Sequence, residues 1–147
     1  MGTRGNVGAI NPEGTVSVRY VHSDADMDYL PYAIASIWWN TFNRDTSATI
    51  AALLAHDWAD LDPTTKPNSH TWAGDVPVAG VGMRIAAPLT DGPVTGRPDQ
   101  IQAHGLMYLL DPTRPSELII SDGKGSDLTG APAFDLNIGE TVHIPQR

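Results

Sequence analysis

The chain has 147 residues, no cysteine, 41% hydrophobic residues and a formal net charge of −8. This length predicts a single domain spanning residues 1–147, because domains usually contain about 100–200 residues. The lack of cysteine excludes disulfide scaffolds, thiolate zinc sites and cysteine nucleophiles. The acidic residues are spread along the chain without a basic cluster, which argues against binding to the phosphate backbone of a nucleic acid.

The hydropathy pattern bears on localisation. No apolar run reaches the ~20 residues that span a bilayer, so we expect no membrane association. No signal-peptide pattern opens the chain. Together these features predict a cytoplasmic protein.

The first predicted element is a β-hairpin. A short apolar run over residues 5–10 leads into Asn11-Pro12-Glu13-Gly14, where proline fixes φ and glycine allows positive φ, as turns require. Residues 15–22 then alternate between two faces of a strand. One of these faces carries Val16, Val18, Tyr20 and His22.

Two helices are predicted next. Residues 29–42 have the apolar spacing of a helix with one buried stripe, and Asp28 is a suitable N-cap. Asn43-Arg44-Asp45 interrupts the pattern, and a second helix is expected from Asp45 or Thr46 to about Trp58. Because the interruption is short, the two helices are expected to be neighbours.

Beyond Asp62-Pro63 the pattern returns to β structure. Residues 88–98 contain three prolines and two glycines and are expected to form a loop, either disordered or with a binding role. Strands are expected over residues 78–86, 103–110, 117–121 and 141–144.

This order of elements predicts an α+β domain. Its sheet is expected to be mostly antiparallel, formed by the N-terminal hairpin and the C-terminal strands, with the two helices packed on one face. A doubly wound α/β fold is the alternative. It is disfavoured because the strands and helices do not alternate regularly.

The densest polar cluster is His22-Ser23-Asp24-Ala25-Asp26-Met27-Asp28. Its three carboxylates repel one another unless water, a helix N-terminus or a cation offsets their charge. An EF-hand is excluded, because Tyr29 and Ala35 stand where its glycine and glutamate are required. A less regular Mg²⁺ or Mn²⁺ site remains open, beside the simpler interpretation that Asp26 and Asp28 cap a helix and Asp24 is solvated.

Asp57 falls within the apolar stripe of the second predicted helix, next to His56. A carboxylate in such a place must be paired or hydrogen-bonded. A structural ion pair is favoured, with Arg4, Arg19 or Arg84 as the partner. In the alternative, Asp57 converges on the acidic cluster and helps to hold a divalent metal ion.

Aromatic residues suggest two further contacts. Tyr32 and Trp39 lie on the side of the first helix opposite to its buried Trp38. Such a helix is either sandwiched within its domain or presents a patch to a partner, and the second possibility predicts a homodimer through Tyr32 and Trp39. Trp72, in an irregular segment, either anchors a loop to the core or stacks on a ligand.

The opening Met-Gly-Thr-Arg, the hairpin and the motif Tyr20-x-His22-x-Asp24 resemble a group of small uncharacterised proteins from actinobacteria and their phages. The resemblance covers about the first quarter of the chain. It implies that Arg4, Tyr20, His22 and Asp24 belong to one site or one structural cluster, and it implies no activity. After Asp24 the sequence departs from the group, whose members continue with an aromatic residue or glycine and then proline.

Three functions follow as hypotheses. The first is a small, acidic, non-enzymatic protein that needs no cofactor and binds a protein or a small-molecule ligand. Its candidate ligand contacts are Arg4, Tyr20, His22, Asp24 and Trp72. The alternative is a metal-dependent hydrolase of a phosphoester or nucleotide, built on His22, Asp24, Asp26 and Asp57, and the third is a purely structural or assembly role.

Overall fold

The computed structural model describes residues 3–71, 74–101 and 104–141. The strands are β1 (Gly5–Ile10), β2 (Val16–Val21), β3 (Trp58–Leu61), β4 (Val76–Val78), β5 (Gly82–Arg84), β6 (Val94–Gly96), β7 (Met107–Asp111), β8 (Arg114–Ser121) and β9 (Ala133–Asp135). The helical elements are α1 (Leu30–Ser36), the π-helix η1 (Ile37–Thr41), α2 (Thr46–Leu54) and the 3₁₀-helices η2 (Pro98–Gln100) and η3 (Leu136–Glu140). The predicted α+β class is therefore confirmed. None of the helices in this described part of the chain is long and apolar enough to cross a membrane.

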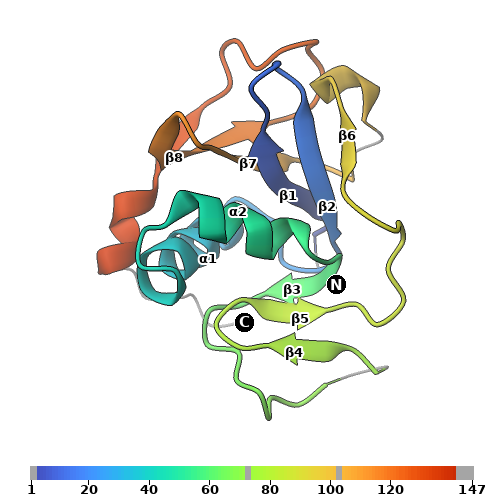
Figure 1. Cartoon of the computed structure of the whole chain (residues 1–147), viewed down its shortest axis with the longest axis vertical. Helices are drawn as coiled ribbons and strands as arrows, with labels where there is room; N and C mark the ends of the chain where they lie inside the picture. Colours follow the sequence, from blue (N-terminus) through green and yellow to red (C-terminus); the bar gives the residue numbers. More distant parts are fainter. Residues whose placement is uncertain (1–2, 72–73, 102–103, 142–147) are drawn as a thin grey trace.

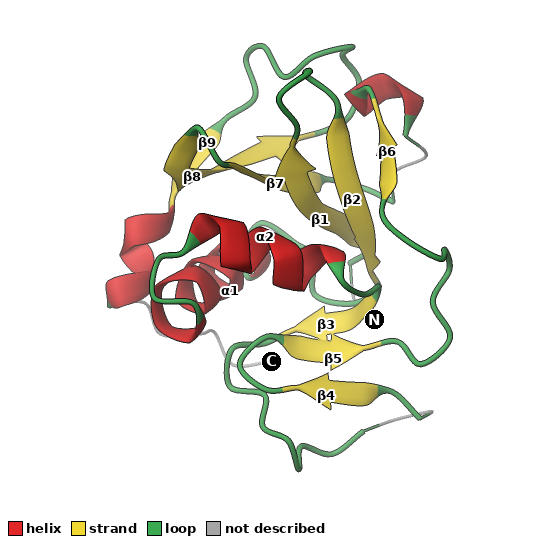
Figure 2. Cartoon of the chain, viewed as in Figure 1, coloured by secondary structure: helices red, strands yellow, loops and turns green. Residues whose placement is uncertain are grey.

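The strands form one curved sheet. Their order is β4-β5-β3-β2-β1-β7-β8-β9, and β6 pairs with β2 beside this path. Figure 1 shows α1 and α2 between two parts of this sheet, the β1–β2–β7 part and the β3–β5–β4 part. Figure 2 shows that loops connect most of the strands.

The predicted N-terminal hairpin is present: β1 has the predicted bounds, and β2 is one residue shorter at each end than the predicted 15–22. β1 and β2 pair antiparallel, with Ile10 opposite Val16 at the turn end. Asn11 closes the turn, because its main-chain N–H donates to Thr15 O at 2.8 Å and its carbonyl accepts from Gly14 N at 3.0 Å. Gly14 has φ 89°, the positive value for which glycine was expected.

The sheet is mixed, which corrects the expectation of a mostly antiparallel sheet. β1 runs parallel to β7, and β2 runs parallel to β3. A parallel pair needs a long crossover between its strands, and α1, η1 and α2 supply that crossover between β2 and β3. The sequence pattern shows where strands occur but not which strands become neighbours, so this pairing was not predicted.

The first helical segment has the predicted extent but changes geometry midway. The prediction covers residues 29–42, and the structure has α1 continued by η1 over almost the same range. The N-cap expected at Asp28 is wrong, because no side chain caps α1. Instead the main-chain carbonyl of Asp26 accepts from Leu30 N at 2.9 Å.

The second helix begins as predicted but ends early. The Asp45 carboxylate accepts a main-chain N–H of the first turn at 2.9 Å, as an N-cap does. The helix ends at Leu54, whereas the prediction extends it to Trp58, which lies in β3. The reason is Arg19: its guanidinium donates to Leu54 O at 3.0 Å and to Ala55 O at 3.2 Å, and so caps the carbonyl end of the helix.

The chain after α2 contains more and shorter strands than predicted. The single strand expected over 78–86 is replaced by the hairpin of β4 and β5. The strands expected over 103–110 and 117–121 correspond to β7 and β8. The expected loop over 88–98 contains β6, and β9 has no counterpart among the predicted strands. Beyond Thr141, the strand expected over 141–144 lies outside the described residues.

Two groups of buried apolar residues lie on the two faces of the central strands. The larger group joins strand residues such as Val21 and Tyr108 to Ile34 of α1. The smaller group is Val16, Val18, Met107, Leu109 and Ile119. Because side chains alternate along a strand, neighbours such as Tyr108 and Leu109 face opposite sides. The central strands are therefore packed on both faces and form a fixed base for the surrounding loops.

Replacement of Gly139 tests the close packing of η3 against α1. A Cβ added there would lie 2.2 Å from Ala35 O and 2.9 Å from the Cβ of Trp39. We expect Gly139→Ala to lower the free energy of unfolding by about 2 kcal/mol, because the main chain must move apart. Urea denaturation measures this loss. Gly92→Ala is the control, since a Cβ there meets nothing within 4 Å; equal losses from the two variants would contradict the packing.

Candidate functional site

The outer edge of β2 is shared by two strands that diverge. β6 pairs with Val16 to Val18, whereas β3 pairs with β2 at Val21. Between these two partners, the main-chain N–H of Tyr20 donates to Oδ1 of Asp57 at 3.2 Å. A side-chain carboxylate thus takes the place that a strand carbonyl would occupy in a continuous sheet.

We call the place where β3 and β6 diverge from β2 the fork, and Asp57 lies at its centre. It is 2% exposed, and its Oδ2 accepts the main-chain N–H of Leu89 at 2.7 Å. Nη1 of Arg19 lies 3.6 Å from Oδ1 of Asp57 and also donates to Thr90 O at 3.2 Å. The predicted structural ion pair is therefore confirmed, with Arg19 as the partner. The pair fastens the start of the 88–98 loop to β2.

Two predicted residues and one unpredicted residue form an aromatic cluster on β2. Tyr20 Oη and His22 Nδ1 share a hydrogen bond of 2.7 Å, as their positions on one strand face allow. The rings of Tyr20 and His104 meet edge to face at 4.8 Å. His104 was missed because it is distant in sequence and no motif marks it. The residue after it, Gly105, has φ 93°, and a Cβ there would lie 2.6 Å from Arg4 O, so the close approach of these two segments requires glycine.

A cavity of about 260 Å³ opens at the fork, and we call it the sheet-face pocket. Its apolar lining is Val18, Leu89, Val94 and Ile101. Tyr20 and His104 supply the aromatic part of the wall, and Asn6 and Thr90 supply polar groups. Asp57 also lines the pocket, but its carboxylate is already bonded to Arg19 and two main-chain amides. The walls are thus mainly apolar, with few polar groups.

The acidic cluster lies in the connection between β2 and α1. His22 N donates to Trp58 O at 2.9 Å, so β3 holds the start of this connection. Asp24 has a left-handed conformation with φ 60°. Burial, together with the charge of Asp26, raises the pKa of Tyr108 to about 12, and the Tyr108 hydroxyl donates to Ala25 O at 2.7 Å.

The predicted metal ligands are not gathered into one group. Within residues 3–71, 74–101 and 104–141, no three histidine or acidic side chains are placed to hold a metal ion. Asp57 belongs to the fork, whereas Asp24 and Asp26 lie in the connection that leads to α1. A Mg²⁺ or Mn²⁺ site on Asp24, Asp26 and Asp57 therefore stays a prediction without support from this geometry.

The other predicted ligand contacts have different positions. Arg4 is exposed and precedes β1, and its carbonyl lies against Gly105, next to His104. Its main chain is thus near the aromatic cluster. Trp72 lies outside the described residues.

The aromatic residues proposed as an interface are partly covered by the chain itself. The rings of Tyr32 and Phe134 meet edge to face at 5.2 Å. Trp39 is half-buried, and the guanidinium of Arg44 lies 4.8 Å from the centre of its ring. These contacts resemble the sandwiched alternative, and a homodimer through Tyr32 and Trp39 stays a prediction.

No family model, curated protein or solved structure matches this chain. The functional assignment therefore depends on geometry. Of the residues singled out in the sequence, Tyr20 and Asp57 line the sheet-face pocket, and His22 is hydrogen-bonded to Tyr20.

Replacement of Asp57 tests the fork. Asp57→Asn removes the negative charge beside Arg19 and places an amide where two N–H groups need an acceptor. We expect the free energy of unfolding, measured with urea, to fall by about 3 kcal/mol. The matched control is Asp99→Asn, which breaks the exposed pair with Arg97 and should cost less than about 1 kcal/mol. A loss from Asp57→Asn no larger than the control would contradict a structural role.

His56 gives the fold a defined pH dependence. Burial, followed by the charges of Arg84 and Arg19, lowers the pKa of His56 from its usual 6.5. The folded chain therefore binds this proton less tightly than the unfolded chain, and stability falls as the pH drops below about 6.5. We expect His56→Gln to reduce the loss of stability between about pH 7.5 and about pH 5, measured by urea denaturation at both values. An equal loss in the variant and the parent protein would contradict the prediction.

Proposed function

We propose that this chain is a small, non-enzymatic binding protein that holds a small, neutral and mainly apolar planar ligand in the sheet-face pocket. One observation carries the proposal. Leu89 and Val94, which line the pocket, are 61% and 40% exposed, and they are two of the four large apolar side chains exposed in the described part of the chain. Exposed apolar side chains gathered around a cavity are typical of a binding site.

The composition of the pocket supports this ligand class. Val18 and Ile101 offer an apolar surface, and the rings of Tyr20 and His104 favour contact with a flat ligand. A small number of polar groups in an apolar pocket usually fixes the orientation of the ligand, and the polar residues Asn6 and Thr90 line this pocket. The Asp57 charge is offset by Arg19, which favours a neutral ligand over a cation.

The bonding of the polar groups favours binding over catalysis. A general base needs an available lone pair near the substrate. Asp57 is 2% exposed, and its carboxylate is held by two main-chain N–H groups and the Arg19 guanidinium, so it offers little to a substrate. The hydroxyl of Tyr20 is hydrogen-bonded to His22. These groups support the shape of the pocket.

We also propose how the helices are placed relative to the ligand and where the chain originates. We place both helices on one face of the central strands, with the ligand on the other face, because Ile34 of α1 packs with Val21 whereas Val18 lines the pocket. The Met-Gly-Thr-Arg opening and the Tyr20-x-His22-x-Asp24 motif support an origin in an actinobacterium or one of its phages.

Indole, a neutral planar molecule, is a suitable probe for this pocket. We expect it to shift the amide resonances of Tyr20, Leu89 and Thr90 in ¹H–¹⁵N correlation spectra. At about 0.3 kcal/mol per non-hydrogen atom, its Kd should be about 10 mM. Val94→Thr combined with Leu89→Ser should raise this Kd about five-fold, because about 1 kcal/mol of apolar contact is lost.

Ile138→Thr is the matched control, since Ile138 is 40% exposed like Val94 but does not line the pocket. Its Kd for indole should equal that of the parent protein. The proposal would be refuted if the chemical-shift changes were spread over the whole surface. It would also be refuted if Ile138→Thr raised the Kd for indole as much as the double variant does.

A further inference from the structure

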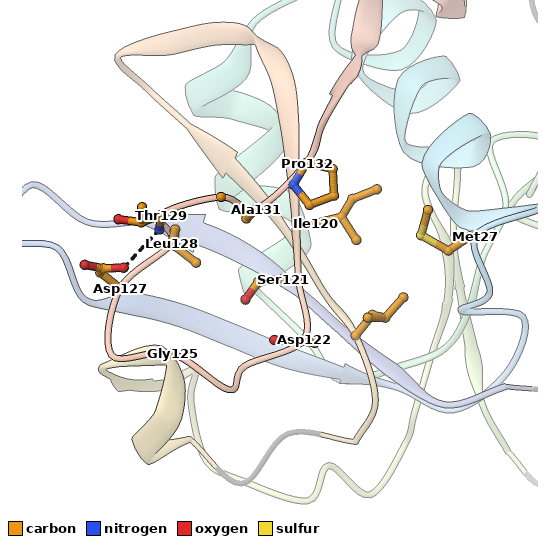
Figure 3. Close-up of a pocket in the computed structure, with 12 residues that line it drawn as sticks. Met27, Ile120, Ser121, Asp122, Gly125, Asp127, Leu128, Thr129, Ala131 and Pro132 are labelled. Atoms are coloured by element: carbon orange, nitrogen blue, oxygen red, sulfur yellow. Dashed lines mark hydrogen bonds between the residues drawn. The ribbon is translucent and has the colours of Figure 1, made fainter.

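A second and larger cavity lies beside the loop that joins β8 to β9. Its volume is about 390 Å³, and we call it the acidic pocket. The residues that matter for its chemistry are Met27, Ile120, Asp122, Asp127, Leu128 and Pro132. Figure 3 shows Met27 and Asp127 on opposite sides of the hollow, with Ile120 and Pro132 between them.

The apolar side of this pocket is open to a ligand. Met27 is 48% exposed although it is a large apolar residue, and it precedes α1. Ile120 on β8 belongs to the buried core and forms part of the base. Pro132 is fixed against this base, because its carbonyl accepts from Ile120 N at 2.9 Å. An exposed methionine beside a formed apolar base is a favourable contact for a ligand of irregular shape.

The polar side carries negative charge in a fixed geometry. Oδ1 of Asp122 accepts from Lys124 N at 3.0 Å, and Oδ1 of Asp127 accepts from Thr129 N at 3.0 Å. Each of these bonds uses one of the two oxygens of its carboxylate, which has about four acceptor sites in all. Hydrogen bonds from Thr129 lower the pKa of Asp127, so this group keeps its charge in mildly acidic solution. The turns therefore orient the carboxylates and leave acceptor capacity for a ligand.

The charge of the lining is one-sided. Among the described residues that line the pocket, Asp122 and Asp127 are charged and none is basic. The chain as a whole has a net charge of −8, so its field adds to the attraction for cations. The lining thus combines an apolar base with two carboxylates, and it matches a molecule that has an apolar body and a cationic group.

We propose that the acidic pocket binds a small organic cation, with an ammonium group attracted by the charges of Asp122 and Asp127 and an apolar body against Met27 and Pro132. This site is distinct from the sheet-face pocket, which is lined by other residues and whose one carboxylate, that of Asp57, is paired with Arg19. The proposal does not depend on the function assigned to that pocket.

Benzylamine and benzyl alcohol test the proposal as a pair, because they differ in charge and share an aromatic body. Benzylamine should shift the amide resonances of Asp122, Gly125 and Leu128 in ¹H–¹⁵N correlation spectra and leave those of Leu89 and Thr90 unchanged. At about 0.3 kcal/mol per non-hydrogen atom, the Kd measured from these resonances should be about 20 mM. Benzyl alcohol should bind at this site at least about five-fold more weakly.

Variants separate the local carboxylates from the overall charge. Asp122→Asn and Asp127→Asn should each weaken benzylamine about three-fold and leave benzyl alcohol unchanged. Asn retains the Oδ1 acceptor, so the turns are kept. Asp111→Asn is the matched control, because Asp111 accepts from Thr113 N at 2.9 Å in the same kind of turn but does not line this pocket.

Met27→Ala tests the apolar contact and should weaken both probes. The proposal is overturned if benzylamine gives no saturable shifts below about 50 mM. It is also overturned if benzyl alcohol binds equally well, or if Asp111→Asn weakens benzylamine as much as Asp127→Asn does.

Discussion

The buried ion pair of Arg19 and Asp57 links more segments than any other interaction described above. Arg19 caps the carbonyl end of α2 and binds the carbonyl of Thr90, and Asp57 binds main-chain amides of β2 and of Leu89. Removing either charge leaves the other buried, which is costly in a protein interior. The pair therefore sets where α2 ends, where β3 begins and where the 88–98 loop starts.

The two proposed binding sites share one principle of construction. The central strands are packed on both faces, and each pocket is completed by a loop fastened to an edge of the sheet. The Arg19–Asp57 pair fastens one loop, and Asx turns at Asp122 and Asp127 shape the other. Rigid strands with adaptable loops are a common arrangement for binding, because loops tolerate change more readily than a core does. The different charges of the two loops are the reason for the different ligands proposed for the two pockets.

Features set by neighbouring residues could be predicted from the sequence. The hairpin, the start of α2 and the Tyr20–His22 contact each depend on residues a few positions apart. Features set by distant residues could not. The need to pair Asp57 was clear from its apolar surroundings, but three arginines were equally suitable in the sequence. The approach of His104 to Tyr20 and the parallel pairing of β2 with β3 depend on crossovers that local patterns do not encode.

The divergence of β3 and β6 from one edge of β2 has a consequence for how such a chain can change over generations. The segment between β5 and β6 is tied at its middle, through Leu89 N, to the carboxylate of Asp57, and its end leads into β6. Leu89, Thr90 and Val94 of this region line the sheet-face pocket. Asp91 is exposed and Gly92 is half-buried, so insertions or deletions there would shift Thr90 and Val94 on either side and change the size of the pocket without a change in the central strands. Related chains with a longer or shorter segment here would therefore bind ligands of different size on the same sheet.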